Sequence, residues 1–250
     1  MIRLLKYKVG GEIMRIKLFF NLENNVIDVQ YRKSIMSWIK HAIQEYDEKL
    51  FDQIYSLNQK KTFSFATILP CPDFKKDKVI LTTNQFYIVF SAYNYSYALH
   101  LYNSFLLQKF KTFHLNQNSM TLVSMSMIPE KNILTDSIKI KMSSPLVVRN
   151  HNRETLKDMY YSYERGEFEK YLKINISEQL EFENLDLSLL EGFEINPLKA
   201  KKIVIPVYEK MIECSIGKFE LRGNVKLLDY LYKAGIGAKK AMGFGLFEIE

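Results

Sequence analysis

The chain has 250 residues, of which 47% are hydrophobic and 25% are charged, a composition that excludes global disorder and is typical of a globular protein. Its formal net charge of +7 favours an anionic partner, with nucleic acid ahead of an anionic membrane surface. No apolar run reaches the roughly 18 residues of a membrane helix. The two cysteines, Cys71 and Cys214, are far apart, which predicts neither a disulfide framework nor a zinc site and fits a cytoplasmic protein.

Hydrophobic periodicity divides the first half of the chain into strands and helices. Residues 1–13 precede the first alternating pattern, and we expect them to form an N-terminal extension outside the fold. The expected elements are a strand (15–22), a helix (31–46), a short helix (48–55), a strand (61–69), a hairpin (78–82 with 85–92), a helix (95–108) with the apolar stripe Leu99, Tyr102 and Leu106, and an extended segment (111–127). This β-α-β-β-α-β order predicts a ferredoxin-like domain over residues 14–136.

A second domain is expected over residues 137–250, although no low-complexity linker marks the boundary. The expected elements are an extended segment (138–148), a mostly helical segment (154–181) that Gly166 can interrupt, two strands (201–207 and 211–222), a helix (224–234) and a last strand (244–249). This order can be read as another β-α-β-β-α-β unit. The predicted fold class is therefore α+β, with two tandem ferredoxin-like (RRM-like) domains.

A glycine-rich motif lies close to the C-terminus. Residues 235–245 read GIGAKKAMGFG and contain four of the 10 glycines of the chain. Such a loop can be a flexible turn before the last strand, or its N–H groups can form an anion-binding nest. Two central lysines add positive charge for a phosphate. The motif is neither a nucleotide P-loop nor a Rossmann fingerprint. The residues predicted to bind RNA here are Gly235, Gly237, Lys239, Lys240, Gly243 and Gly245.

The sequence of this motif closely resembles that of the C-terminal glycine-rich loop of the CRISPR-associated Cas6 endoribonucleases. Their pattern is Gly-hydrophobic-Gly, a basic pair and then Gly-Phe-Gly. Residues 61–65 (KTFSF) resemble the second-strand segment of the family, and residues 144–149 (SPLVVR) resemble the start of its second domain. The first strand and the helix that opens near Tyr31 and Arg32 also agree, so the resemblance extends from Met14 to the C-terminus.

The resemblance implies two ferredoxin-like domains and a defined reaction on RNA. Such proteins bind the CRISPR repeat in a guide-RNA precursor and cut it once. The 2′-hydroxyl of the RNA attacks, which leaves a 2′,3′-cyclic phosphate and a 5′-hydroxyl without a metal ion or another cofactor. The implied partners are the precursor and mature guide RNA, together with subunits of a CRISPR effector complex. A monomer or a homodimer without membrane contact is expected.

This reaction needs a base, an acid and positive charge at the phosphate. The resemblance implies a catalytic histidine on or just after the first helix, and His41 occupies that place. His41 falls off the predicted apolar stripe of this helix, so it can face solvent or RNA. Tyr31, Tyr46 and Tyr55 are candidate partners that could orient the 2′-hydroxyl or donate a proton, and the alternative for each is packing in the core.

Basic residues in two further places are candidates for RNA contacts. Lys40, Lys60 and Lys61 could stabilise charge on the phosphate, or they are solvated surface lysines. A cluster after the predicted domain boundary contributes Arg149, His151 and Arg153, for which an exposed loop is the alternative. The remaining histidines, His100 and His114, are expected on a helix surface and in a strand.

Two other functions fit the same residues. A non-catalytic subunit that binds guide RNA would keep the fold and the glycine-rich loop without cutting. An unrelated basic RNA-binding protein would be favoured if the loop packed inside, away from any basic groove. A role at a membrane surface is the least favoured, since no basic amphipathic helix stands out.

Overall fold

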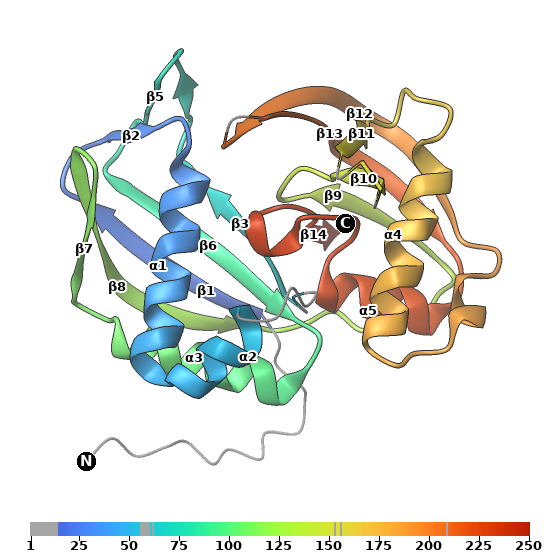
Figure 1. The fold of residues 1–250 in the computed structure, drawn as a ribbon, viewed down its shortest axis with the longest axis horizontal. Helices are drawn as coiled ribbons and strands as arrows, with labels where there is room; N and C mark the ends of the chain where they lie inside the picture. Colours follow the sequence, from blue (N-terminus) through green and yellow to red (C-terminus); the bar gives the residue numbers. More distant parts are fainter. Residues whose placement is uncertain (1–14, 56–60, 62, 153, 156, 209) are drawn as a thin grey trace.

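The computed structural model describes residues 15–55, 61, 63–152, 154–155, 157–208 and 210–250, which form two α/β units side by side (Figure 1). The predicted extension over residues 1–13 lies outside the described residues. The first unit contains β1 (Arg15–Leu22), β2 (Val26–Asp28), α1 (Tyr31–Tyr46), α2 (Glu48–Tyr55), β3 (Phe63–Ile68), β4 (Asp73–Phe74), β5 (Lys78–Ile80), β6 (Gln85–Ala92), α3 (Tyr95–Leu107), β7 (Thr112–Leu115) and β8 (Asn118–Ile128).

The first unit is built on an antiparallel sheet with the strand order β3-β6-β1-β8-β7. Its strands β3, β6, β1 and β8 have the ferredoxin-like order, and β7 adds an edge. Helices α1 and α3 pack on one face, where the ring of Trp38 lies 5.0 Å from that of Phe20 and 5.2 Å from that of Phe105. The apolar residues of α1 recur every three or four positions, and this stripe forms its contact with the sheet.

Asp47 makes the turn from α1 to α2. Its N–H donates to Ile43 O at 2.9 Å, and its carboxylate accepts from the N–H of Leu50 at 3.0 Å, which caps the start of α2. This turn brings α2 back beside the C-terminal half of α1.

The second unit has the same topology. Its antiparallel sheet has the order β12-β13-β9-β14, again the ferredoxin-like arrangement, and β10 and β11 form a separate hairpin. Helices α4 and α5 bury Leu172 and Leu231 in one core with Phe219. The elements are β9 (Ser137–Met142), β10 (Val148–Asn152), β11 (Lys157–Tyr161), α4 (Phe168–Phe182), a 3-10 turn (Leu187–Leu190), β12 (Glu194–Val207), β13 (Lys210–Arg222), α5 (Val225–Ala234), a second 3-10 turn (Lys240–Met242) and β14 (Phe247–Ile249).

The tandem ferredoxin-like fold is thus confirmed, and the domain boundary near residue 137 stays a prediction. The predicted hairpin of residues 78–82 with 85–92 is wrong. β5 pairs with β2 and β4, whereas β6 lies between β1 and β3. The reason is that β6 is buried on both faces: Phe90 belongs to the main core, while Ser91 on the other face donates its hydroxyl to Lys233 O at 2.7 Å.

Two further predictions need correction. Residues 157–161 are a strand and not part of a helix, because the Asn152 carboxamide accepts hydrogen bonds from two following N–H groups and turns the chain back. Helix α4 therefore begins only at Phe168. In α3 the predicted stripe is displaced: Leu99 is 37% exposed, and Leu101 and Phe105 are buried instead. Contact of Phe105 with the Trp38 ring accounts for this rotation of the helix.

The C-terminal segment joins the two units. Arg15 of β1 is fully buried and donates to the carbonyls of Tyr232 and Phe247 at 2.7 and 2.9 Å, and it pairs with Glu248 at 2.6 Å. Leu246 packs against Ala66 and Val89 on the outer face of the first sheet. The end of α5, the glycine-rich loop and β14 therefore hold the two units together.

Candidate functional site

His41, the histidine predicted to act in catalysis, lies on an exposed face of α1 among surface charges. Its side chain is 51% exposed, and its Nε2 atom lies 3.4 Å from Glu45 Oε2. The Glu45 carboxylate also binds the ammonium of Lys111 and accepts from Gln108 Nε2 at 2.8 Å. These hydrogen bonds, with Lys111 first, hold the pKa of Glu45 below its ordinary value. Among the described residues, no hydrogen bond or ring contact joins His41 to the three tyrosines predicted as its partners.

The three candidate tyrosines do not share one site. Tyr31 and Tyr46 are the first and last residues of α1, so about 22 Å of helix separates their backbones at roughly 1.5 Å per residue. Tyr55 ends α2. At most one of Tyr31 and Tyr46 can therefore act on a given phosphate.

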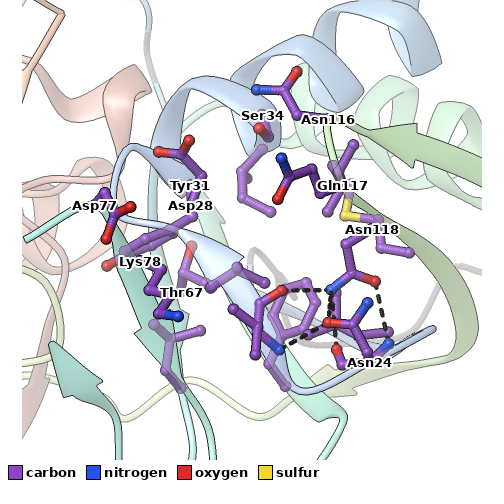
Figure 2. A pocket seen from close by; sticks show the side chains of 18 residues that line it. Asn24, Asp28, Tyr31, Ser34, Thr67, Asp77, Lys78, Asn116, Gln117 and Asn118 are labelled. Carbon is purple, nitrogen blue, oxygen red and sulfur yellow. Dashed lines mark hydrogen bonds between the residues drawn. The ribbon is translucent and has the colours of Figure 1, made fainter. Parts of the chain in front are cut away.

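Tyr31 lines a cavity of about 540 Å³ at the N-terminal end of α1 (Figure 2). The rim carries the carboxylates of Asp28 and Asp77, and Lys78 is the one basic side chain among the described residues that line the cavity. Burial raises the pKa of Tyr31, so the phenol stays neutral. Because two carboxylates repel an anion, this cavity is poorly suited to a phosphate even though it is the larger of the two main cavities.

Three predicted residues do come together where α1, α2 and the start of β3 meet, and they form the lysine–tyrosine cluster: Lys40, Tyr55 and Lys61. The Nζ atoms of Lys40 and Lys61 lie 5.1 and 5.3 Å from the centroid of the Tyr55 ring. Burial, followed by the charge of Lys40, lowers the pKa of Lys61. Burial raises the pKa of Tyr55, so its hydroxyl remains a proton donor at neutral pH. Lys60 lies outside the described residues.

A second cavity, of about 460 Å³, contains Lys61 and lies between α2, α3 and the end of α4. Its lining includes His100, Tyr97 and Glu183, and burial raises the pKa of the Glu183 carboxyl. Tyr46 meets His100 and not His41, since its hydroxyl lies 3.5 Å from His100 Nδ1. His100 was expected on a helix surface. The sequence did contain a signal for this position. His100 follows Ser96 by four residues, so both side chains lie on one face of the helix, and both line the cavity.

The glycine-rich loop packs inside the protein. Gly235, Gly237, Gly243 and Gly245 all have φ between +75° and +84°, a region that favours glycine. The N–H groups of Ile236, Ala238 and Gly245 donate to backbone carbonyls at 2.7–2.9 Å, so these groups are not available to an anion. The loop is thus a rigid connection between the two units, and these donors do not form the anion-binding nest considered from the sequence.

The two lysines of the loop have different surroundings. Lys240 is only 7% exposed, and its Nζ atom donates to Gln179 Oε1 at 2.7 Å, while Gln179 Nε2 donates to Gly237 O at 2.6 Å. In this structure the Lys240 ammonium is not accessible to a phosphate, and it ties the loop to α4. Lys239 instead lies beside the β10–β11 hairpin, with its Nζ atom 3.9 Å from Asp158 Oδ2.

The β10–β11 hairpin gathers a second charged group, the Asp158 cluster. Asp158 pairs with His151 Nδ1 at 2.8 Å and with Arg149 Nη1 at 3.5 Å, and it accepts a hydrogen bond from the Tyr160 hydroxyl at 2.9 Å. Burial opposes ionisation, but the bonds from His151 and Tyr160 hold the pKa of Asp158 below its ordinary value. Burial, then the charge of Arg149, lowers the pKa of Lys239.

The structure brings Arg149, His151 and Lys239 together around Asp158, and their contact with RNA stays a prediction. Asp158 and Tyr160 were missed, because the segment that contains them was read as helical. Arg153 lies outside the described residues. The residues that the structure describes contain no group of three or more His, Cys, Asp or Glu side chains placed to hold a metal ion. None of the helices in the described part of the chain is long and apolar enough to cross a membrane.

Comparison with known proteins identifies relatives of this arrangement. Residues 128–249 match the family described as CRISPR associated protein Cas6, C-terminal. No curated protein matches the chain significantly.

Several solved structures share the fold over 95% of this chain, among them the following three. One is described as the characterization of a Cas6-related gene from Pyrococcus furiosus, with a TM-score of 0.83, 18% identity and 98% of that chain covered. A second, described as an RAMP protein binding different RNA substrates, has a TM-score of 0.82, 19% identity and 99% coverage. A third, a CRISPR associated protein Cas6, has a TM-score of 0.76, 19% identity and 99% coverage.

Proposed function

We propose that this chain, whose residues 128–249 match the Cas6 C-terminal family and whose fold is shared with Cas6 structures, is a Cas6-type protein that binds the repeat RNA of a guide-RNA precursor and cuts it without a metal ion. The reaction is attack of a 2′-hydroxyl on the adjacent phosphate. It requires positive charge on the phosphate and groups that move protons at the attacking and leaving oxygens.

The observation that carries this proposal is the lysine–tyrosine cluster. Two ammonium groups lie within 5.3 Å of the centroid of one phenol ring, at a corner where three elements meet and beside a cavity. Lys40 and Lys61 can stabilise the charge that develops on the phosphate, and Tyr55 can donate a hydrogen bond to it. His41 stays a predicted catalytic residue, although it lies within a separate surface ion-pair group.

RNA binding is proposed to extend to the second unit. Arg149, His151 and Lys239 place a guanidinium, an imidazole and an amine on the β10–β11 hairpin and the adjacent loop. Such groups contact phosphates, which sets the position of the RNA without reading its sequence. The guide RNA, effector subunits and a monomeric or dimeric state remain the expected partners and assembly.

One observation favours a second function, that of a non-catalytic subunit that binds guide RNA. The lysine–tyrosine cluster contains no histidine, and His41 is half exposed and held by Glu45. A protein with this arrangement could hold RNA at the cluster without transferring protons.

The test is cleavage of a labelled cognate repeat RNA in EDTA, with a second substrate that carries a 2′-deoxy sugar at the cut site. We expect the wild type to cut the first substrate only. Tyr55→Phe and Lys61→Met should each slow cutting by at least about tenfold, and the control Lys173→Met, which removes an α4 lysine paired with Glu169, should not. Tight binding without cutting would establish the non-catalytic function instead.

A further inference from the structure

The cavity beside the lysine–tyrosine cluster contains a histidine that the sequence did not single out. His100 projects from α3, and it lines the same cavity of about 460 Å³ as Lys61. This volume falls in the range of about 300–1,000 Å³ that is typical of small-molecule sites. A phosphate held by Lys61 would therefore share its site with an imidazole.

The imidazole is oriented by a contact on its far side. The Tyr46 hydroxyl lies 3.5 Å from His100 Nδ1, and the two rings are 6.1 Å apart between centroids. Within the described residues, Nε2 of His100 takes part in no hydrogen bond, so it is available to a bound molecule. Helix α3 is anchored at its start by Asn94, whose side chain accepts from the N–H of Tyr97, and this cap sets the position of the histidine one and a half turns later.

The charges around His100 suit the hydroxyl and phosphate of a nucleotide. Lys61 supplies an amine, and Tyr46 and Tyr97 supply phenol hydroxyls. Glu183, at the end of α4, faces the cavity from the second unit, and its Oε1 atom is buried without a hydrogen-bond partner among the described residues.

The remaining walls suit the base of such a nucleotide. Phe182 is 39% exposed at the edge of the cavity, and Tyr97, Leu50 and Ile54 add further apolar surface. Aromatic side chains that remain exposed in a polar site are the surfaces on which unpaired bases stack. The cavity thus combines a place for a phosphate with a place for a base.

We propose that this cavity holds the nucleotide on the 5′ side of the cut and that His100 accepts the proton of its 2′-hydroxyl. The inference rests on the proposed function and adds the proton acceptor that the lysine–tyrosine cluster lacks. His100 Nε2 takes the proton as the 2′-oxygen bonds to phosphorus. The bond from phosphorus to the 5′-oxygen breaks, and that oxygen takes a proton from the Lys61 ammonium. Water then returns the proton from His100 to Lys61, so the protein is unchanged.

The experiment compares His100→Ala and His100→Gln with the matched control His114→Gln, which changes a histidine of β7 outside the cavity. Single-turnover cleavage of pre-bound repeat RNA is measured from pH 5 to 9, with RNA affinity and the unfolding midpoint measured on each variant. We expect both His100 variants to lose about 10²–10⁴-fold in rate with affinity within twofold, and to show a pH–rate profile that differs in shape from that of the wild type. Free imidazole should restore part of the rate of His100→Ala.

The outcomes separate the two proposals. A His100→Gln variant that cuts at the wild-type rate overturns this inference and leaves the proposed function intact. Slow cutting that imidazole does not restore, together with weaker RNA binding or a lower unfolding midpoint, would assign His100 a structural role and also overturn it. A wild type that binds the repeat without cutting overturns both proposals.

Discussion

Gly237→Ala tests whether the glycine-rich loop is a structural connection between the two units. Gly237 has φ of +84°, and a Cβ atom there would lie 2.5 Å from Val147 O and 2.6 Å from Leu146 Cδ1. The left-handed backbone alone costs about 1–2 kcal/mol for alanine. Val147 O already accepts from the Ala238 N–H at 2.7 Å, so moving it away weakens a hydrogen bond worth about 0.5–1.5 kcal/mol.

The sum is a loss of roughly 1.5–3.5 kcal/mol in the free energy of unfolding. Two other glycines of the chain serve as controls that separate the backbone term of this sum from the term for the close contact. Gly192 has φ of +68° with nothing within 4 Å of a Cβ atom, so Gly192→Ala measures the backbone cost alone. Gly166 has neither a positive φ nor a neighbour within 4 Å, so Gly166→Ala should change stability by less than about 0.5 kcal/mol.

The assay is urea unfolding at neutral pH, followed by circular dichroism and by tryptophan fluorescence. Trp38 is the single tryptophan and lies in the first unit, so the fluorescence signal reports on that unit. If Gly237→Ala loses no more stability than Gly192→Ala, the close approach to Val147 O has no energetic consequence and the loop is not a rigid connection.

Three further perturbations have defined outcomes. Arg15→Met removes a buried guanidinium that donates to two carbonyls and should lower the free energy of unfolding by about 2–4 kcal/mol in urea; a loss below 1 kcal/mol would contradict the role of this contact. The Arg165 hydrogen bond lowers the pKa of Glu213 from 4.5 to about 2, so the stability it contributes is present above pH 4.5 and is lost as the pH falls toward 2. The wild type should therefore exceed Glu213→Gln in stability at pH 7, by about 1–2 kcal/mol after allowance for the exposure of Arg165, and this difference should shrink by pH 2.5; a constant difference would refute the linkage. Asp158→Asn removes a negative charge among basic groups and should tighten repeat-RNA binding several-fold at low salt, measured by fluorescence anisotropy, with a gain that fades as salt increases; weaker binding would show instead that Asp158 is needed to orient His151.

Local sequence patterns correctly predicted the helices and strands whose secondary structure depends on the residues of that segment alone. The helix from Tyr31 to Tyr46 and the strand from Arg15 to Leu22 have the predicted ends, because their apolar periodicity is uninterrupted and turn residues follow each of them. The glycine-rich motif was also readable, since four glycines with a basic pair between them form a specific pattern.

Periodicity was misleading where burial is set by a partner from elsewhere in the chain. β6 was assigned to a hairpin because the residues that bury its second face, which include Leu246 near the C-terminus of the chain, are distant in sequence. Residues 157–161 were predicted to be helical because the turn that precedes them depends on hydrogen bonds to the Asn152 side chain, and the composition of residues 157–161 does not indicate this turn. The glycines were expected to bind an anion, but the N–H groups of Gly245 and Ala238 donate to the carbonyls of Pro145 and Val147, which lie about a hundred positions earlier in the chain.

By itself, then, the sequence predicted the tandem ferredoxin-like fold, the resemblance to the Cas6 family and a set of basic and aromatic candidates, because each of these depends on composition, periodicity or a contiguous motif. Only the tertiary structure decided which candidates meet. Lys61, His100 and Glu183 line one cavity although they belong to three separate parts of the chain, and His41 lies apart from it. The physical reason is that a catalytic arrangement depends on distances between side chains, and these distances are set by how helices and sheets pack and not by spacing along the chain.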